Sequence, residues 1–265
     1  MSIAFKRARD EVDKIKRHRN KCLIIHYACQ SLYDDRDGLS PSISNIVVKN
    51  FDNDQTVSFA AHLVAEKLHI DKERITEKFV EIETKLLEDF FLFVQSHNGD
   101  LWLHWNMINI HFGFETLAHR FYVLTGRNAP SIDVDNRINV AAVLQGLYGE
   151  KYVGIPHMQK LMEINGGVRR DFVLGKDEVD LFRQGDYARL HASTASKVRF
   201  FSDVVEMIID KKLKTETAKL YIKAERAVDG FSAKLVGLAA SIYAIVDLAH
   251  KATDYIQSHG LRLPL

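Results

Sequence analysis

The segment Asp100–Arg120, DLWLHWNMINIHFGFETLAHR, concentrates side chains that could carry chemistry. A short apolar run ends in His104 and Asn106, and a helix is predicted to follow. That helix would carry three ligand-capable side chains on one stripe, at spacing i, i+4, i+8: His111, Glu115 and His119. Open α/β folds place their ligands where strands end and helices begin. The segment therefore predicts a functional site.

The residue types allow three interpretations of this site. Imidazole and carboxylate groups suit zinc or another first-row metal, and the candidate ligands are His104, His111, Glu115 and His119. A metal-free alternative is acid–base chemistry, with His104 or His119 tuned by Glu115. The third interpretation is structural, with hydrogen-bonded histidines at the sheet edge and a solvated helix face.

Apolar periodicity predicts the elements that must position these groups. Cys22–Cys29 is typical of a buried strand, and 44–51 with 56–60 is typical of a hairpin. Further elements are predicted as a strand at 101–105 and helices at about 75–97, 108–124, 137–148, 157–165, 176–184, 186–212 and 216–257. We expect strands 22–29 and 101–105 to be parallel neighbours, which would bring His26 and His104 to one sheet edge. The predicted fold is a mixed sheet of about five strands with helices on both faces.

The order of these elements resembles the ribonuclease-H-like fold of the DEDD 3′–5′ exonucleases, the DnaQ-like group. Ile24–Ala28, IIHYA, stands where that family has a strand ending in Asp-x-Glu. Leu103–Phe112, LHWNMINIHF, is similar to its His-Asn…Phe-Asp segment, and Leu190–Lys197, LHASTASK, to its closing His-x4-Asp. The resemblance covers roughly residues 20–212. It implies a nuclease-related site lined by His26, His104, Asn106, His111, Glu115, His119 and His191.

This chain departs from the family at the metal-binding carboxylates. His26 and Ala28 occupy the first pair, Asn109 or His111 stands near the second aspartate, and Ser196 occupies the last. Two-metal hydrolysis needs carboxylates to hold two divalent ions, and imidazole is a poor magnesium ligand. The resemblance thus predicts an altered site, in which His191 or His104 would be the base and Asn106 would orient a phosphate or a divalent metal.

Composition limits the classes of partner. The chain has 36 Lys+Arg against 35 Asp+Glu, so binding to nucleic acid must come from a local patch. Residues 2–20 predict a basic amphipathic helix whose candidate phosphate contacts are Lys14, Lys16, Arg17 and Arg19. Single-stranded nucleic acid is the expected partner, with Trp102, Trp105, Tyr27 and Tyr33 as candidates for base stacking.

The predicted organisation is a basic helix at 1–20, a ribonuclease-H-like domain at 21–212 and a helical extension at 213–265. Apolar residues of 226–257 recur at helical spacing and predict homo-oligomerisation through the C-terminal helices. The run 235–246 is too short to span a bilayer, and no signal peptide is apparent, so a cytoplasmic location is expected. Arg19 and His26 also match the spacing of HEPN ribonucleases, but those residues require a helix where a strand is predicted. Three functions stay open: a nuclease-related binding protein, an oligomeric interaction module, or a metal-dependent hydrolase.

Overall fold

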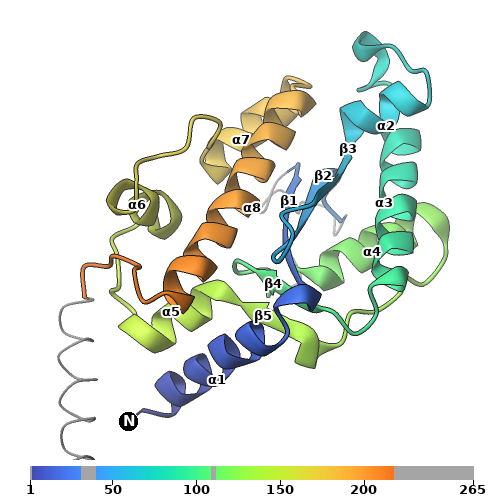
Figure 1. The fold of residues 1–265 in the computed structure, drawn as a ribbon. Coiled ribbons are helices and arrows are strands. Elements are labelled where there is room, and N and C mark those ends of the chain that lie inside the picture. The colour runs from blue at the N-terminus through green and yellow to red at the C-terminus, as the bar shows by residue number, and fades with distance from the viewer. Residues whose placement is uncertain (1, 31–39, 109–111, 218–265) are drawn as a thin grey trace, which may run out of the picture. The chain divides into compact units, whose positions relative to one another are not determined.

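A five-stranded mixed sheet forms the centre of the protein (Figure 1). The computed structural model describes residues 2–30, 40–108 and 112–217. Its strands, in the spatial order β3-β2-β1-β4-β5, are β1 (Cys22–Cys29), β2 (Ile43–Asn50), β3 (Thr56–Ala60), β4 (Leu101–His104) and β5 (Arg137–Asn139). β1, β4 and β5 run parallel, whereas β2 is antiparallel to both of its neighbours. The predicted α/β class and the adjacency of the two apolar strands are confirmed.

Helices cover both faces of the sheet. They are α1 (Ile3–Arg17), α2 (Ala61–Lys67), α3 (Phe79–Ser96), α4 (Phe114–Thr125), α5 (Val140–Tyr148), α6 (His157–Ile164), α7 (Gly175–Arg183) and α8 (Tyr187–Ile209). The buried residues of α2, α3 and α4 pack on one face, and those of α1, α5 and most of α8 pack on the other (Figure 1). Tyr187 and Leu190, at the start of α8, belong to the first layer. No helix of the described residues is long and apolar enough to cross a membrane.

β1 divides the hydrophobic core into two layers. All eight of its residues are buried, as expected for a central strand covered on both faces. Its side chains alternate, so Ile25 packs with Phe90 of α3, whereas Ile24 packs with Phe201 of α8. This alternation decides which helix each polar side chain of the strand meets.

The basic N-terminal helix is part of this compact unit, which extends from Met1 to Thr217. Ala8, Val12 and Ile15 of α1 are buried in the second layer. α1 approaches α5 closely because Gly146 has no side chain: a Cβ there would lie 2.7 Å from the Cβ of Ala8. Of the predicted extension at 213–265, the part beyond Thr217 lies outside the described residues.

The structure corrects two predicted helices. The helix expected from about Ile108 begins at Phe114, because Gly113 is extended and forms a bridge with Ile108. The helix expected over 137–148 begins at Val140, because residues 137–139 pair with β4 as strand β5. Three residues are too few to show a period-2 pattern, so long-range pairing decides this strand. The short helix α2 has no counterpart among the predicted elements.

Candidate functional site

His26 is buried under α8, on one face of the sheet. Its ring lies edge-on to Phe112 and Phe201, with centroid distances of 5.5 and 5.4 Å. Burial lowers its pKa well below the usual value, and the charge of Lys197 acts in the same direction. Its Nδ1 is buried without a hydrogen-bond partner among the described residues. His26 is therefore a neutral imidazole in an aromatic environment.

His104 is buried on the opposite face, although its strand lies beside that of His26. Ile25 is the register partner of His104, so His26, one residue on, faces the other way. The His104 ring lies 5.5 Å from that of Phe114, and its Nδ1 accepts a hydrogen bond of 3.2 Å from the Met107 amide. Burial, with the nearby Arg137 charge, lowers its pKa to about 4. The expectation that these two imidazoles share one pocket is wrong.

Asn106 joins the end of β4 to the start of α5. Its amide N–H donates to Asn139 Oδ1 at 3.1 Å, and Asn139 Nδ2 donates back to Asn106 Oδ1 at 3.2 Å. Asn139 also caps α5 by accepting from the Ala141 amide. Asn106 adopts a left-handed conformation, with φ of 55°, which asparagine tolerates better than most residues. These two hydrogen bonds connect the end of β4 to the N-terminus of α5, so Asn106 has a structural role.

The predicted stripe on the helix is not continuous. α4 carries Glu115 and His119, whereas His111 precedes the helix and lies outside the described residues. Glu115 forms an ion pair of 2.5 Å with Arg137, and His119 is exposed. Hydrogen bonding to Arg137 and its charge outweigh partial desolvation, which by itself raises the pKa of Glu115, and leave that pKa below its usual value.

A cleft of about 190 Å³ opens beside this ion pair. Its walls come from α3, α4 and the segment that leads into β5, and they are Phe90, Phe91, Phe114, Glu115, Leu117, Ala118, Ala129, Pro130, Ser131, Ile132 and Arg137. Arg137 holds its place there through three interactions. It donates to the Ile132 carbonyl, pairs with Glu115, and lies over the Phe114 ring at 4.8 Å from the centroid.

His191 lies far along α8 from the aromatic cluster around His26. Its Nε2 is 2.8 Å from Ser58 Oγ on β3, and its ring centroid is 5.2 Å from that of His62 on α2. Burial, with the neighbouring His62 and Arg199, lowers the pKa of His191 to about 4. A second cleft, of about 370 Å³, borders His62 and the start of α8. His191 is therefore grouped with Ser58 and His62 and does not join His104.

The charge of Lys197 on α8, which acts on His26, is neutralised by Glu178 on α7. Lys197 Nζ lies 2.7 Å from Glu178 Oε1, which also accepts a 2.7 Å hydrogen bond from Ser193. All three side chains are buried. On the same face, the ring of Trp105 stacks on that of Phe201 at 5.1 Å. The space between β1 and α8 is thus occupied by aromatic rings and a closed ion pair.

The predicted donors that lie in the described part of the chain, His104, Glu115 and His119, do not form a metal centre there. Across residues 2–30, 40–108 and 112–217, no group of three or more His, Cys, Asp or Glu residues is placed to hold a metal ion. Of the predicted ligands, His104 faces inward from β4 and Glu115 is paired with Arg137, while His119 is exposed. His111 is not described, so the four-residue set as a whole stays a prediction.

The candidate phosphate-binding residues of the N-terminus differ in exposure and in the hydrogen bonds and ion pairs that they already make. Lys16 and Arg17 are exposed, although Arg17 also donates to the Asp13 carbonyl at 3.2 Å. Lys14 donates to the Asp135 carbonyl at 2.5 Å. Arg19 pairs with Glu206 and Asp52 and lies 4.2 Å from the centroid of the Phe51 ring. Lys16 and Arg17 are therefore the residues of this group that are best able to meet a ligand.

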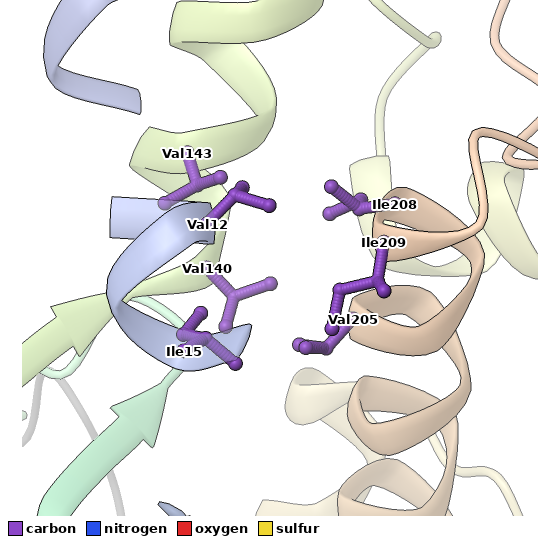
Figure 2. A pocket seen from close by; sticks show the side chains of 7 residues that line it. All are labelled: Val12, Ile15, Val140, Val143, Val205, Ile208 and Ile209. Atoms are coloured by element: carbon purple, nitrogen blue, oxygen red, sulfur yellow. The ribbon is translucent and has the colours of Figure 1, made fainter. Parts of the chain in front are cut away.

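A small gap between α1, α5 and α8 is a packing feature. Figure 2 shows aliphatic side chains from the three helices converging on it, namely Val12, Ile15, Val140, Val143, Val205, Ile208 and Ile209. Its space of about 10 Å³ is at the lower limit for one water molecule, and no polar group lines it. It offers a ligand neither room nor a hydrogen bond.

The residues that sequence reasoning missed are Arg137, Asn139, Glu178 and Lys197. Each acts through a partner that is distant in sequence, and although Lys197 ends the segment Leu190–Lys197, no motif assigns a role to any of the four. Only Asn139 had a signal in the sequence, because an asparagine directly before an apolar helical run is a typical N-cap. Comparison with known proteins adds no homologue: no family model matches this chain, and no curated protein matches it.

Proposed function

We propose that this chain is a nuclease-related nucleic-acid-binding protein with a ribonuclease-H-like domain and an altered site that lacks metal-dependent cleavage. The supporting observation is the sheet order β3-β2-β1-β4-β5, in which only β2 runs antiparallel to its neighbours. The hairpin of β2 and β3 and the parallel pair of β1 and β4 agree with the element order on which the resemblance to the DEDD exonucleases rests. The helices on both faces and the long α8 after β5 agree with the same family.

The side chains between β1 and α8 support the loss of cleavage. His26 and Ala28 occupy the positions of the first carboxylate pair, and Ser196 occupies the last. His26 contacts two aromatic rings and Ser196 is buried. Two-metal hydrolysis requires hard oxygen ligands around both ions. These side chains do not suit a pair of magnesium ions. We therefore propose that the domain binds nucleic acid without cleaving it.

Phosphate contacts, more than base stacking, would supply affinity. Trp102, Trp105 and Tyr27 are buried, so these three aromatic residues are unavailable for stacking on bases. Lys16 and Arg17, near the end of α1, are exposed and carry positive charge. Neutralising phosphates releases counterions, and the resulting affinity falls steeply with salt.

Fluorescence anisotropy with labelled single-stranded DNA and RNA tests the binding. The wild-type chain should bind at about 50 mM salt and lose affinity strongly by about 200 mM. The double variant Lys16→Ala/Arg17→Ala should bind more weakly and lose about 1.4 from the magnitude of the log–log salt slope, because each single-strand phosphate contact contributes about 0.7. The matched control is Lys78→Ala/Lys85→Ala, which removes the same charge from α3 and its N-cap.

Two results would count against the proposal. One is the absence of binding at low salt, and the other is an equal loss of affinity in both double variants, which would indicate a general charge effect. Cleavage is tested separately with the same strands in Mg²⁺ and Mn²⁺ and with EDTA as the control. We expect intact strands throughout, and metal-dependent cleavage that copurifies with the wild-type chain would refute the altered-site half of the proposal.

A further inference from the structure

The chain contains two Asn–Gly pairs, Asn98–Gly99 and Asn165–Gly166. Glycine has no Cβ, so the backbone nitrogen that follows such an asparagine can closely approach the side-chain carbonyl carbon. Attack of that nitrogen on that carbon is the first step of deamidation, the reaction that makes asparagine a thermolabile residue. Whether the reaction occurs in a folded protein depends on the groups that hold the side chain and the following amide.

Asn98 and Gly99 lie at the centre of the turn that joins α3 to β4. The Asp100 amide closes this turn by donating to the His97 carbonyl at 3.2 Å. Asn98 and Gly99 are both exposed, and neither the Asn98 side chain nor the Gly99 amide has a hydrogen-bond partner within the described residues. Gly99 has a φ of 94°, and a Cβ placed there would meet no atom within 4 Å. The reacting atoms are therefore free to approach each other.

Asn165 is held in place, although it also precedes a glycine. It is half-buried at the C-terminus of α6, where its Nδ2 donates to the carbonyls of Leu161 and Lys214, each at 2.9 Å. Its Oδ1 accepts a hydrogen bond from the Lys214 amide, also at 2.9 Å. Both ends of the carboxamide are thus engaged, and these hydrogen bonds must break before the Gly166 nitrogen can reach the side-chain carbon.

We propose that Asn98 is a site of spontaneous deamidation in the folded protein, and that its hydrogen bonds protect Asn165 from the same reaction. The Gly99 nitrogen gives its proton to water and attacks the side-chain carbonyl carbon of Asn98. The bond from that carbon to the side-chain nitrogen then breaks, and ammonia leaves. Water opens the resulting cyclic imide at either of its carbonyl groups, which yields aspartate or isoaspartate. The net reaction consumes water and releases ammonia, and it needs no enzyme.

This modification changes the connection between α3 and β4. Either product places a second carboxylate beside Asp100, which is half-buried and whose pKa is already raised by burial. Isoaspartate also adds a methylene group to the main chain within residues 97–100, which separate the end of α3 from the start of β4. We therefore expect the isoaspartyl form to unfold at a lower temperature than the unmodified chain.

Incubation of the full chain in mildly alkaline buffer, followed by tryptic peptide mapping with mass spectrometry, tests the proposal. Peptide 86–120 should gain the mass difference between an amide and an acid, and fragmentation should locate the change at Asn98. The modified peptide should separate into aspartyl and isoaspartyl forms. Peptide 161–169, which contains Asn165, should react at least about tenfold more slowly, because its hydrogen bonds must break first.

Two controls accompany this experiment. Asn98→Gln should abolish the change, because the longer side chain forms a cyclic imide much more slowly. In urea both Asn–Gly pairs should react at similar rates, because the unfolded chain no longer holds Asn165. Equal rates at the two pairs in the folded chain, or an intact Asn98 while the urea sample reacts, would overturn the proposal. A difference that persists in urea would refute the protection of Asn165 by the fold.

Discussion

His26 and His104 lie on adjacent parallel strands, yet their rings point to opposite faces of the sheet. Ile25 is the register partner of His104, and alternation therefore places His26 on the α8 side. The His26 ring contacts Phe201 of α8, whereas the His104 ring contacts Phe114 of α4. The two rings thus lie on different faces of the sheet, although they are near enough for the charge of His104 to help lower the pKa of His26. Catalysis that requires both at one reacting atom is incompatible with this arrangement.

The two histidines should respond differently to the same substitution. His104→Leu removes the acceptor of the buried Met107 N–H, whereas His26→Leu removes a ring whose Nδ1 has no partner in the described part of the chain. A buried donor left unsatisfied costs about 1–3 kcal/mol. We expect His104→Leu to lower the free energy of unfolding by about that much more than His26→Leu does. Urea unfolding measures both, and an equal cost would contradict the assigned hydrogen bond.

Stability should fall as the pH drops from about 6.5 to 4. The pKa of His104 in the folded protein is about 4, below its ordinary value near 6.5. Between these values the unfolded chain binds a proton that the folded chain does not, so acid favours unfolding. The contribution of His104 is complete above pH 6.5 and lost by about pH 4, and His191 acts in the same direction.

Unfolding at a series of pH values tests this assignment. His104→Leu should weaken the dependence on pH between 6.5 and 4, because it removes one of the titrating groups. A slope that is unchanged in His104→Leu would show that this imidazole is protonated in the folded state.

The buried pair of Lys197 and Glu178 should show strong coupling. Lys197→Met leaves the Glu178 carboxylate without its cation, which lies 2.7 Å away, and should cost about 3–5 kcal/mol. The double variant Lys197→Met/Glu178→Gln removes both charges and should recover a large part of that loss. A double-mutant cycle by chemical denaturation gives the coupling energy. Additive effects would mean that the pair contributes little.

Gly146 should resist substitution even though it lies within a helix. Glycine to alanine in a helix interior ordinarily gains up to about 1 kcal/mol. Here the new Cβ would lie 2.7 Å from Ala8 Cβ and 2.8 Å from the carbonyl oxygen of Ala4, so α1 would have to move. We expect Gly146→Ala to lose about 1–3 kcal/mol, the usual cost of overpacking.

The matched control is Gly175→Ala at the start of α7, where no atom lies within 4 Å of the new Cβ. This variant should be neutral or slightly stabilised in thermal unfolding. A gain of stability in Gly146→Ala would show that α1 does not pack against α5 as closely as the structure indicates.

Apolar runs, turn residues and helical periodicity predict many of the helices and strands of this fold. The uninterrupted apolar run of Cys22–Cys29 predicted a strand covered on both sides, and all eight residues are buried. The hairpin of β2 and β3 was predicted with the correct strands, because turn residues and alternation are local signals. The long amphipathic patterns of α3 and α8 were recognised for the same reason, within a few residues of their ends.

The candidate site was only partly predictable. Asp100–Arg120 was recognised as the segment where polar groups follow a strand, and Glu115 does border a cleft. Its partner Arg137 comes from β5, a strand three residues long that its own sequence does not reveal. The predicted group of histidines divides instead between His26 under α8, His104 under α4 and His191 beside Ser58.

The sequence by itself determined the kinds and order of the elements and the adjacency of the two apolar parallel strands. These features follow from periodicity, turn chemistry and short connections, which each segment carries within itself. Only the tertiary structure decided which face each polar side chain occupies and which charges neutralise each other. The face that a side chain occupies depends on the register between strands, because a shift of one residue moves it to the other side of the sheet. The pairing of charges depends on contacts between residues that are far apart in the chain.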